Sequence, residues 1–185
     1  EHIELARGWA DAHVRFEGHD VTSTPFPAGP AGLIYARLVL AHLPDPLATA
    51  RLWATQLEPG GFLVLDEIEW IRTRHPALTE HLRIVHGLIA AGGAAMNAGP
   101  ALADLGDVDG LVRVHAEVAE VSVATGLAAR MFTLSLEITG ERAIAAGLID
   151  RPGLRDLRAV LGELSWSTET GETWGLHQSI HMRER

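Results

Sequence analysis

Cysteine and lysine are both missing from the 185-residue sequence, and all 15 of its Lys and Arg positions are arginine. Without cysteine there can be no disulfide bond, Cys-ligated zinc, iron–sulfur cluster or thiolate nucleophile. Without lysine there can be no Walker-type phosphate-binding loop and no Schiff-base chemistry. The simplest explanation for the missing lysine is a general compositional bias toward arginine. These absences exclude classes of protein but do not name a function.

Long apolar runs are also lacking, because no segment approaches the roughly 20 residues that a membrane-spanning helix needs. The net charge of −9 disfavours a nucleic-acid partner held by phosphate contacts. No charged-then-apolar leader is visible at the N-terminus. We therefore expect a cytoplasmic protein without nucleic-acid or membrane partners. The length fits one domain, residues 1–185, and 47% hydrophobic residues can build a sizeable core.

Hydrophobic periodicity alternates between helix and strand in the first part of the chain. The expected elements are a helix over 1–11, strands over 13–18 and 33–40, a helix over 47–57 and a strand over 62–65. Asp45 and Pro46 are typical of the start of a helix. Trp9 and Trp53 are most simply core residues. This alternation predicts an α/β fold with a parallel sheet.

The second part of the chain adds helices before and between its last strands. The expected elements are helices over 78–95 and 100–105, a strand over 111–123, helices over 127–146 and 154–164, and a strand over 173–182. Because helical segments within 71–110 and 127–165 interrupt the strands, we expect them to form a cap or lid.

Three segments carry a resemblance to a known family. They are DVTSTPFP at 20–27, LIYARLVLAHLPDP at 33–46 and LEPGGFLVLD at 57–66. In this order they resemble the central and downstream motifs of the class I S-adenosylmethionine-dependent methyltransferases, specifically over 13–70 and loosely beyond. The resemblance implies a Rossmann-like sheet with the family's strand order 3-2-1-4-5-7-6, and S-adenosylmethionine as cofactor.

The resemblance also assigns cofactor-binding residues. Asp20 matches the acid that accepts a hydrogen bond from the adenine amino group, and Val21 would offer its backbone beside it. An Asx turn is the structural alternative for Asp20. Ala36, Arg37 and Leu38 match the segment beneath the methionine portion of the cofactor.

Arg37 is the one charge in an otherwise apolar predicted strand, where a charge is costly unless it is paired. It meets either a carboxylate of the cofactor or a protein acid, Asp66 or Glu67, on the neighbouring strand. Both alternatives stay open from the sequence.

His42 and the acids after the second buried strand are the catalytic candidates. His42 is expected at the carboxyl edge of the sheet, where α/β proteins bind ligands, and would orient the acceptor or act as a general base. A histidine that caps the following helix is the alternative. One of Asp66, Glu67 and Glu69 is expected to face the acceptor, and Glu67 is the candidate that we name.

The remaining histidines predict no metal site. His81 and His86 are five residues apart, which is off the i, i+4 face that a zinc-binding helix needs. His177 and His181 share one face of a predicted strand without having to converge on one ion.

Two parts of the family pattern are not found, namely the glycine-rich loop and the first two strands. The sequence begins inside the helix that follows them. We therefore expect the 33–40 strand to form an exposed apolar edge of the sheet. We also expect this chain by itself to bind S-adenosylmethionine weakly, and calorimetry that gave micromolar binding would contradict this.

The leading hypothesis is methyl transfer to a small-molecule acceptor, with the apolar lid favouring a partly apolar one. The alternative is a non-catalytic protein of the same fold that uses its helical cap for dimerisation or ligand binding, which leaves a homodimer open. A Rossmann-type dehydrogenase would share the sheet but not the PFP and HLPDP segments.

Overall fold

The computed structural model describes residues 2–105 and 110–185. Glu1 of the predicted first helix and residues 106–109 of the predicted lid lie outside the described residues. The elements in chain order are α1 (His2–Arg7), β1 (Ala31–Arg37), the 3-10 helix η1 (Leu40–His42), α2 (Pro46–Ala54), β2 (Leu57–Arg72), α3 (Pro76–Ala91), α4 (Gly99–Leu102), β3 (Leu111–Ala124), α5 (Thr125–Ala145), α6 (Arg151–Leu164) and β4 (Thr170–Arg183).

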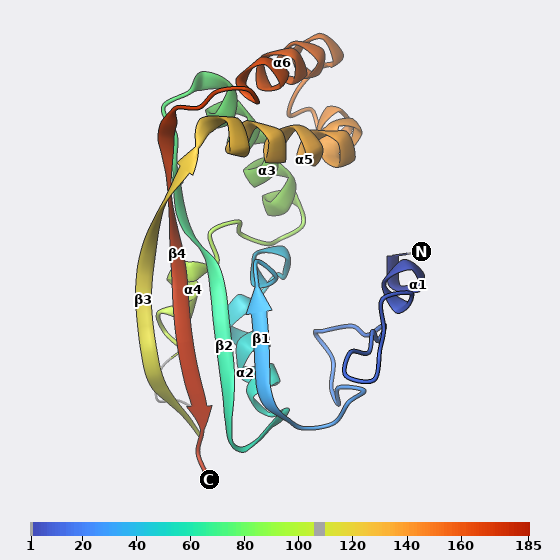
Figure 1. Cartoon of the computed structure of the whole chain (residues 1–185), viewed down its shortest axis with the longest axis vertical. Helices are drawn as coiled ribbons and strands as arrows, with labels where there is room; N and C mark the ends of the chain where they lie inside the picture. Colours follow the sequence, from blue (N-terminus) through green and yellow to red (C-terminus); the bar gives the residue numbers. More distant parts are fainter. Residues whose placement is uncertain (1, 106–109) are drawn as a thin grey trace.

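A four-stranded mixed sheet in the order β1-β2-β4-β3 forms the body of the molecule (Figure 1). β1 and β2 are parallel, and β4 is antiparallel to both of its neighbours. This order matches the 4-5-7-6 half of the sheet that the resemblance implies, so the α/β prediction is confirmed. β2 runs on to Arg72, past Asp66, the register partner of Arg37, so the residues that follow β1 lie beside the later part of β2. The acids Asp66, Glu67 and Glu69 therefore lie within β2, and the prediction that they follow the strand was wrong.

β1 is an outer strand of the sheet, as predicted. Among the described residues it pairs only with β2, and the side chains of Leu33 and Tyr35 are 58% and 57% exposed. The predicted strand over 13–18 was wrong, because these residues lie outside helix and strand. A strand is stable only when a neighbour accepts its backbone hydrogen bonds, and Figure 1 shows this segment apart from β1.

The predicted core position of Trp9 was also wrong, since its side chain is 82% exposed. The helix that precedes it is short and ends at Arg7, away from the sheet (Figure 1). Trp53 is a core residue as predicted, with 3% of its side chain exposed.

The body core lies between the sheet and helices α2 and α4. Asp45 starts α2 as predicted, because its Oδ1 accepts the backbone N–H of Ala48 at 2.8 Å and Pro46 takes the first helical turn. Trp53 of α2 and Leu102 of α4 belong to the same buried cluster as Leu65 of β2.

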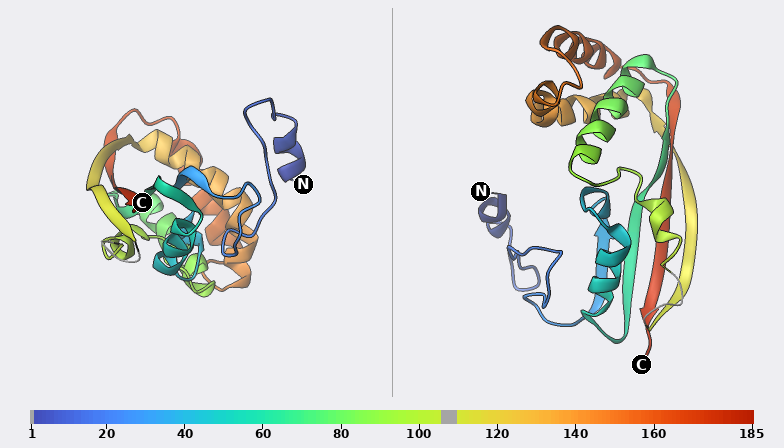
Figure 2. Two further views of the ribbon diagram at one scale, coloured as in Figure 1. Left: turned by 90° about the horizontal axis from the view of Figure 1, so that it is seen from below. Right: turned by 180° about the vertical axis from the view of Figure 1, so that it is seen from behind.

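A second buried cluster joins α3, α5 and α6 beyond the carboxyl end of β1 and beside the last part of β2 (Figures 1 and 2). Its fully buried members include Leu78, Leu136 and Leu161, one from each helix. These helices form the cap of the molecule. No helix within the described residues combines the length and the apolarity needed to cross a membrane.

The short helix α4 differs from the expected lid. It packs on β2 and β4 instead of joining the other cap helices. Gly99 allows this close approach, because a Cβ at that position would lie 2.8 Å from the Cβ of His177 on β4. We therefore assign α4 to the body.

Candidate functional site

The turn after β1 has an unusual backbone conformation at the predicted cofactor segment. Leu38 has a φ of 54°, the left-handed region that residues with a Cβ rarely adopt. Its N–H donates to the carbonyl of Asp66 at 3.0 Å, which continues the pairing of β1 with β2 by one residue. Such strain persists only where neighbouring contacts hold it and is concentrated at functional sites.

Glu67 supplies contacts that hold this turn. Its Oε1 accepts the N–H groups of Val39 and Leu40 at 2.8 and 2.9 Å, and the side chain is fully buried. Burial raises the pKa of Glu67 above its ordinary value, although these backbone hydrogen bonds favour the charged form. In this structure the carboxylate faces the backbone of the turn, so the residue acts by positioning Leu38 and its neighbours.

Arg37 forms the protein ion pair that was one of its two predicted alternatives. Its Nε lies 3.3 Å from Oδ2 of Asp66, its register partner on β2. The Asp66 side chain is 9% exposed and that of Arg37 is 57% exposed. The guanidinium therefore remains on the surface at the carboxyl edge while it neutralises a buried acid.

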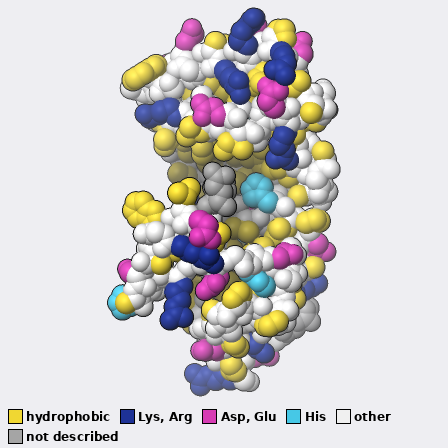
Figure 3. Space-filling view, turned by 90° about the vertical axis from the view of Figure 1, so that its right-hand side faces the viewer, with side chains coloured by type: hydrophobic (Ala, Val, Ile, Leu, Met, Phe, Trp, Pro, Cys, Tyr) yellow, Lys and Arg dark blue, Asp and Glu magenta, His cyan; other side chains and the backbone are white. Residues whose placement is uncertain are grey.

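His42 lies in η1, on the side of the body that faces the cap. It lines a cavity of about 270 Å³ together with residues of α3 and α5, among them Ile89, Ser135 and Arg142. Figure 3 shows a hollow between the body and the cap, with hydrophobic side chains along the edge of the cap, which is the upper part in this view. The capping alternative for His42 does not apply, because Asp45 caps the following helix.

Asp20 forms the Asx turn that was its structural alternative. Its Oδ1 accepts both the N–H and the hydroxyl of Thr22, at 2.9 and 2.7 Å. The side-chain bond from Thr22, followed by the backbone bond, holds the pKa of Asp20 below its ordinary value. The side chain is exposed, so Asp20 presents an ionised carboxylate to solvent.

Val21 lies next to the predicted cofactor segment of β1. Its carbonyl accepts the indole N–H of Trp53 at 2.7 Å, which fastens this loop to α2. A cavity of about 210 Å³ opens between the loop and β1, and its lining residues are Val21, Phe26, Ile34, Tyr35, Ala36, Val39 and Trp53. The sequence did not assign Trp53 a role in positioning the loop, because a buried tryptophan at helical spacing has a sufficient explanation as core.

The sequence-predicted residues therefore surround one turn but do not share one cavity. Val21 and Ala36 line the cavity beside β1, and Arg37 and Leu38 line a larger one beneath α5. His42 lines the cavity against α3 and α5. The turn after β1, whose backbone N–H groups donate to Glu67, adjoins these three cavities.

The predicted face shared by His177 and His181 is confirmed, since both side chains are buried on the same side of β4. Nδ1 of His177 lies 3.5 Å from Oε2 of Glu69. Burial lowers the pKa of His177, while Glu69 opposes that shift. Within the described residues, no three His, Asp or Glu side chains are grouped as ligands for a metal ion.

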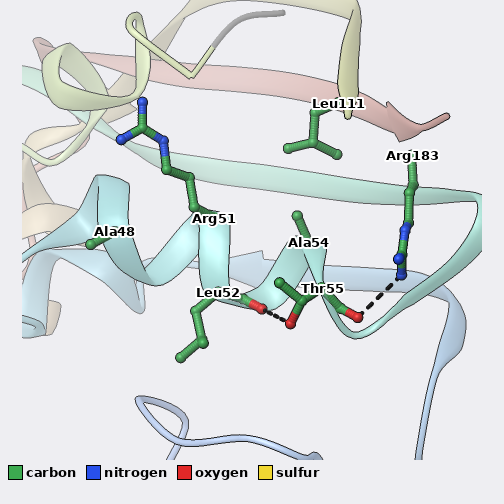
Figure 4. A pocket seen from close by; sticks show the side chains of 7 residues that line it. All are labelled: Ala48, Arg51, Leu52, Ala54, Thr55, Leu111 and Arg183. Carbon is green, nitrogen blue, oxygen red and sulfur yellow. Dashed lines mark hydrogen bonds between the residues drawn. The ribbon is translucent and has the colours of Figure 1, made fainter. Parts of the chain in front are cut away.

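A further cavity of about 340 Å³ lies at the opposite end of the sheet, where β4 ends beside α2 (Figure 4). Arg183 donates there to the carbonyls of Thr55, at 3.1 Å, and Leu57. These bonds connect the end of β4 to the loop that leads into β2. We interpret this place as a structural junction remote from the candidate site.

Comparison with known proteins shows which family the first part of the chain is similar to. Residues 3–90 match the family described as a methyltransferase domain. The match supports assignment of this part of the chain to a methyltransferase domain. The matched region contains the loop of Asp20, the turn after β1 and the strand that carries Glu67, so the site described above lies on the family's own framework.

A relative and a solved structure that are similar to this chain are also methyltransferases. Methyltransferase str2 from Strobilurus tenacellus is 37% identical over 59 residues, which are 31% of this chain and 22% of that protein. The structure of coclaurine N-methyltransferase bound to N-methylheliamine and SAH aligns with a TM-score of 0.54 and 13% identity over 97% of this chain and 56% of that one.

A third likeness shows that the methyltransferase fold also serves another reaction. The [4+2]-cyclase SpnF aligns with a TM-score of 0.50 and 19% identity over 98% of this chain and 60% of that one. At such identities these structural likenesses show the fold alone. This chain spans less than two thirds of the length of each of the three proteins.

Proposed function

We propose that the chain transfers a methyl group from S-adenosylmethionine to a small-molecule acceptor at the carboxyl end of β1. The observation that carries the proposal is the cavity shared by Val21 and Ala36. These residues come from two segments that the family resemblance links to one cofactor, and in the fold they line one cavity. The SAH in the coclaurine N-methyltransferase structure, which is the demethylated form of that cofactor, supports the choice of donor.

The chemistry of this cavity fits the adenine end of the cofactor. Its lining is mainly apolar and includes Phe26 and Trp53, which suits a flat ring. The neighbouring Asp20 is an ionised hydrogen-bond acceptor. Asp20 and Val21 would hold the adenine end, and Ala36, Arg37 and Leu38 the methionine end. When bound, the cofactor supplies an electrophilic methyl group on its sulfonium sulfur.

The residues of this chain would act mainly by positioning the reactants. In-line attack on a methyl group needs the two reactants held close and aligned, which fixed side chains and a fixed backbone supply. Glu67 holds the strained turn at Leu38, and the cap helices cover the carboxyl edge. His42 is placed to take a proton from an acceptor that is protonated at the working pH.

The Asp20→Asn variant tests the cofactor part of this proposal. Asparagine keeps an oxygen for Thr22 but loses the negative charge and points an amide donor toward the same space. We expect millimolar S-adenosylmethionine or its demethylated product to raise the Tm of the wild-type chain. The Asp20→Asn variant should lose at least about half of that increase.

Asp11→Asn is the matched control. Asp11 is also exposed and also accepts backbone N–H groups, those of His13 and Val14. This variant should keep the full increase in Tm. A wild-type chain whose Tm does not respond at millimolar concentration would overturn the proposal in favour of a non-catalytic protein, and equal responses of the two variants would overturn the role of Asp20.

A further inference from the structure

An apolar cavity of about 370 Å³ lies between the underside of α5 and the sheet, beside the turn at Leu38. The cavity is lined by the end of β1, by strands β2, β3 and β4, and by the first half of α5. The lining residues are Arg37, Leu38, Ile68, Val121, Val123, Leu127, Ala128, Met131, Trp174 and Leu176. Its volume falls in the range of small-molecule pockets, about 300–1,000 Å³.

The side chains of this cavity leave apolar surface uncovered. Leu127, Met131 and Leu38 are 55%, 44% and 38% exposed, although all three lie at one cavity. A contiguous exposed apolar patch of this kind is typical of a ligand or partner site. A ligand with its own apolar surface would bury these side chains.

The charges at the cavity disfavour a cationic ligand. None of its lining residues, all of which belong to the described part of the chain, is acidic. Arg37 is the charged lining residue, and its Nε lies beside Asp66. A cation would therefore lose its hydration, meet an arginine and find no carboxylate in the lining to offset either cost. An uncharged ligand avoids both penalties.

One wall of the cavity is fixed by aromatic packing. Trp174 is parallel to Phe132, with ring centroids 6.4 Å apart and planes 8° apart. Phe132 in turn stacks on the buried ring of His81 at 4.0 Å. This row of three rings anchors Trp174 in the cap core, so the cavity offers a preformed aromatic surface.

We propose that this cavity binds the ring system of an uncharged, apolar acceptor, with Met131 and Trp174 as its main contacts. The inference rests on the proposed function, because it places the acceptor beside the same turn that would carry the methionine end of the cofactor. Arg37 at the rim would direct a hydroxyl group of the acceptor toward the strand ends, since a guanidinium donates hydrogen bonds and accepts none.

The test compares two naphthalene compounds of similar size by calorimetry, without any methyl donor. One is 2-naphthol, which is uncharged at pH 7, and the other is 1-naphthylmethylamine, which is a cation. We expect 2-naphthol to bind the wild-type chain at least about tenfold more tightly. Met131→Glu should weaken 2-naphthol binding by at least about tenfold, because it places a carboxylate in the apolar lining.

Leu134→Glu is the matched control. Leu134 is also exposed on α5, at 61%, but does not line the cavity, so this variant should bind 2-naphthol within about twofold of the wild type. Both positions are exposed, and both variants are expected to fold. Equal binding of the two compounds, or equal loss in the two variants, would overturn the inference. So would dimerisation in sedimentation measurements that both variants abolish, since a second copy would then cover α5.

Failure of this inference can be distinguished from failure of the proposed function. An increase in Tm with S-adenosylmethionine, combined with no preference for 2-naphthol, would retain methyl transfer but contradict the apolar acceptor. The reverse combination would retain the ligand cavity and contradict the cofactor.

Discussion

Replacing Glu67 with alanine is expected to lower the free energy of unfolding by about 3 kcal/mol. The carboxylate accepts the N–H groups of Val39 and Leu40 in a fully buried position. Alanine would leave both donors without this partner and would open a small void. The effect is smaller than two charged hydrogen bonds would suggest, because burial already disfavours the ionised carboxylate and raises its pKa. Urea denaturation at pH 7 measures the change.

Two further variants distinguish the loss of the hydrogen bonds to the turn from a general effect of removing a glutamate from β2. Glu67→Gln keeps one acceptor oxygen and nearly the same shape, and should cost only about 1 kcal/mol. Glu58→Ala removes an exposed acid at the start of the same strand and should stay within about 0.5 kcal/mol of the wild type. If Glu67→Ala were no more destabilising than Glu58→Ala, the turn would not depend on this carboxylate.

His81 is expected to make the fold sensitive to acid. Its side chain is 2% exposed, and neither ring nitrogen has a hydrogen-bond partner among the residues that the structure describes. Burial lowers the pKa of His81 from 6.5 to about 4 because the buried site disfavours the imidazolium ion. Below pH 6.5 the unfolded chain binds a proton that the folded chain does not. The free energy of unfolding should therefore fall by about 3 kcal/mol between pH 6.5 and pH 4 on account of this residue.

The contribution of His81 is measured as a difference between variants. His81→Phe keeps a ring against Phe132 but cannot bind a proton, so it should lose about 3 kcal/mol less than the wild type over this pH range. Its other titrating groups are unchanged and cancel in the comparison. His86→Gln removes an exposed histidine of the same helix and should follow the wild-type curve. A His81→Phe variant with the wild-type pH dependence would contradict this prediction.

Local signals in the sequence predicted the elements that local interactions determine. Asp45 and Pro46 marked the start of α2 correctly, and the apolar run at 33–40 predicted a strand where β1 lies. The strand over 13–18 failed for a different reason. Alternation of Val14 and Phe16 gives a strand-like pattern, but pairing depends on a neighbour that the pattern does not specify.

The candidate site was predictable in position but not in the roles of its residues. Motif order placed Arg37, His42 and Glu67 near the carboxyl ends of two strands, but β2 runs on to Arg72, so Glu67 lies within that strand. The inward direction of Glu67 follows from the register of β2 and from the conformation of Leu38, and neither has a sequence signature. The apolar spacing of Leu127 and Met131 was visible in the sequence, but helical spacing of this kind usually indicates core.

The central position of β4 has a consequence for how the molecule forms. Asp66 on β2 pairs with Gln178 on β4, so this contact closes a loop that spans more than half of the chain. Such non-local pairing is slow, whereas α5 and α6 are neighbours in sequence and can associate early. We expect the cap helices to be organised before the middle of the sheet closes. The hollow between the body and the cap would then be the last part of the protein to acquire its native shape.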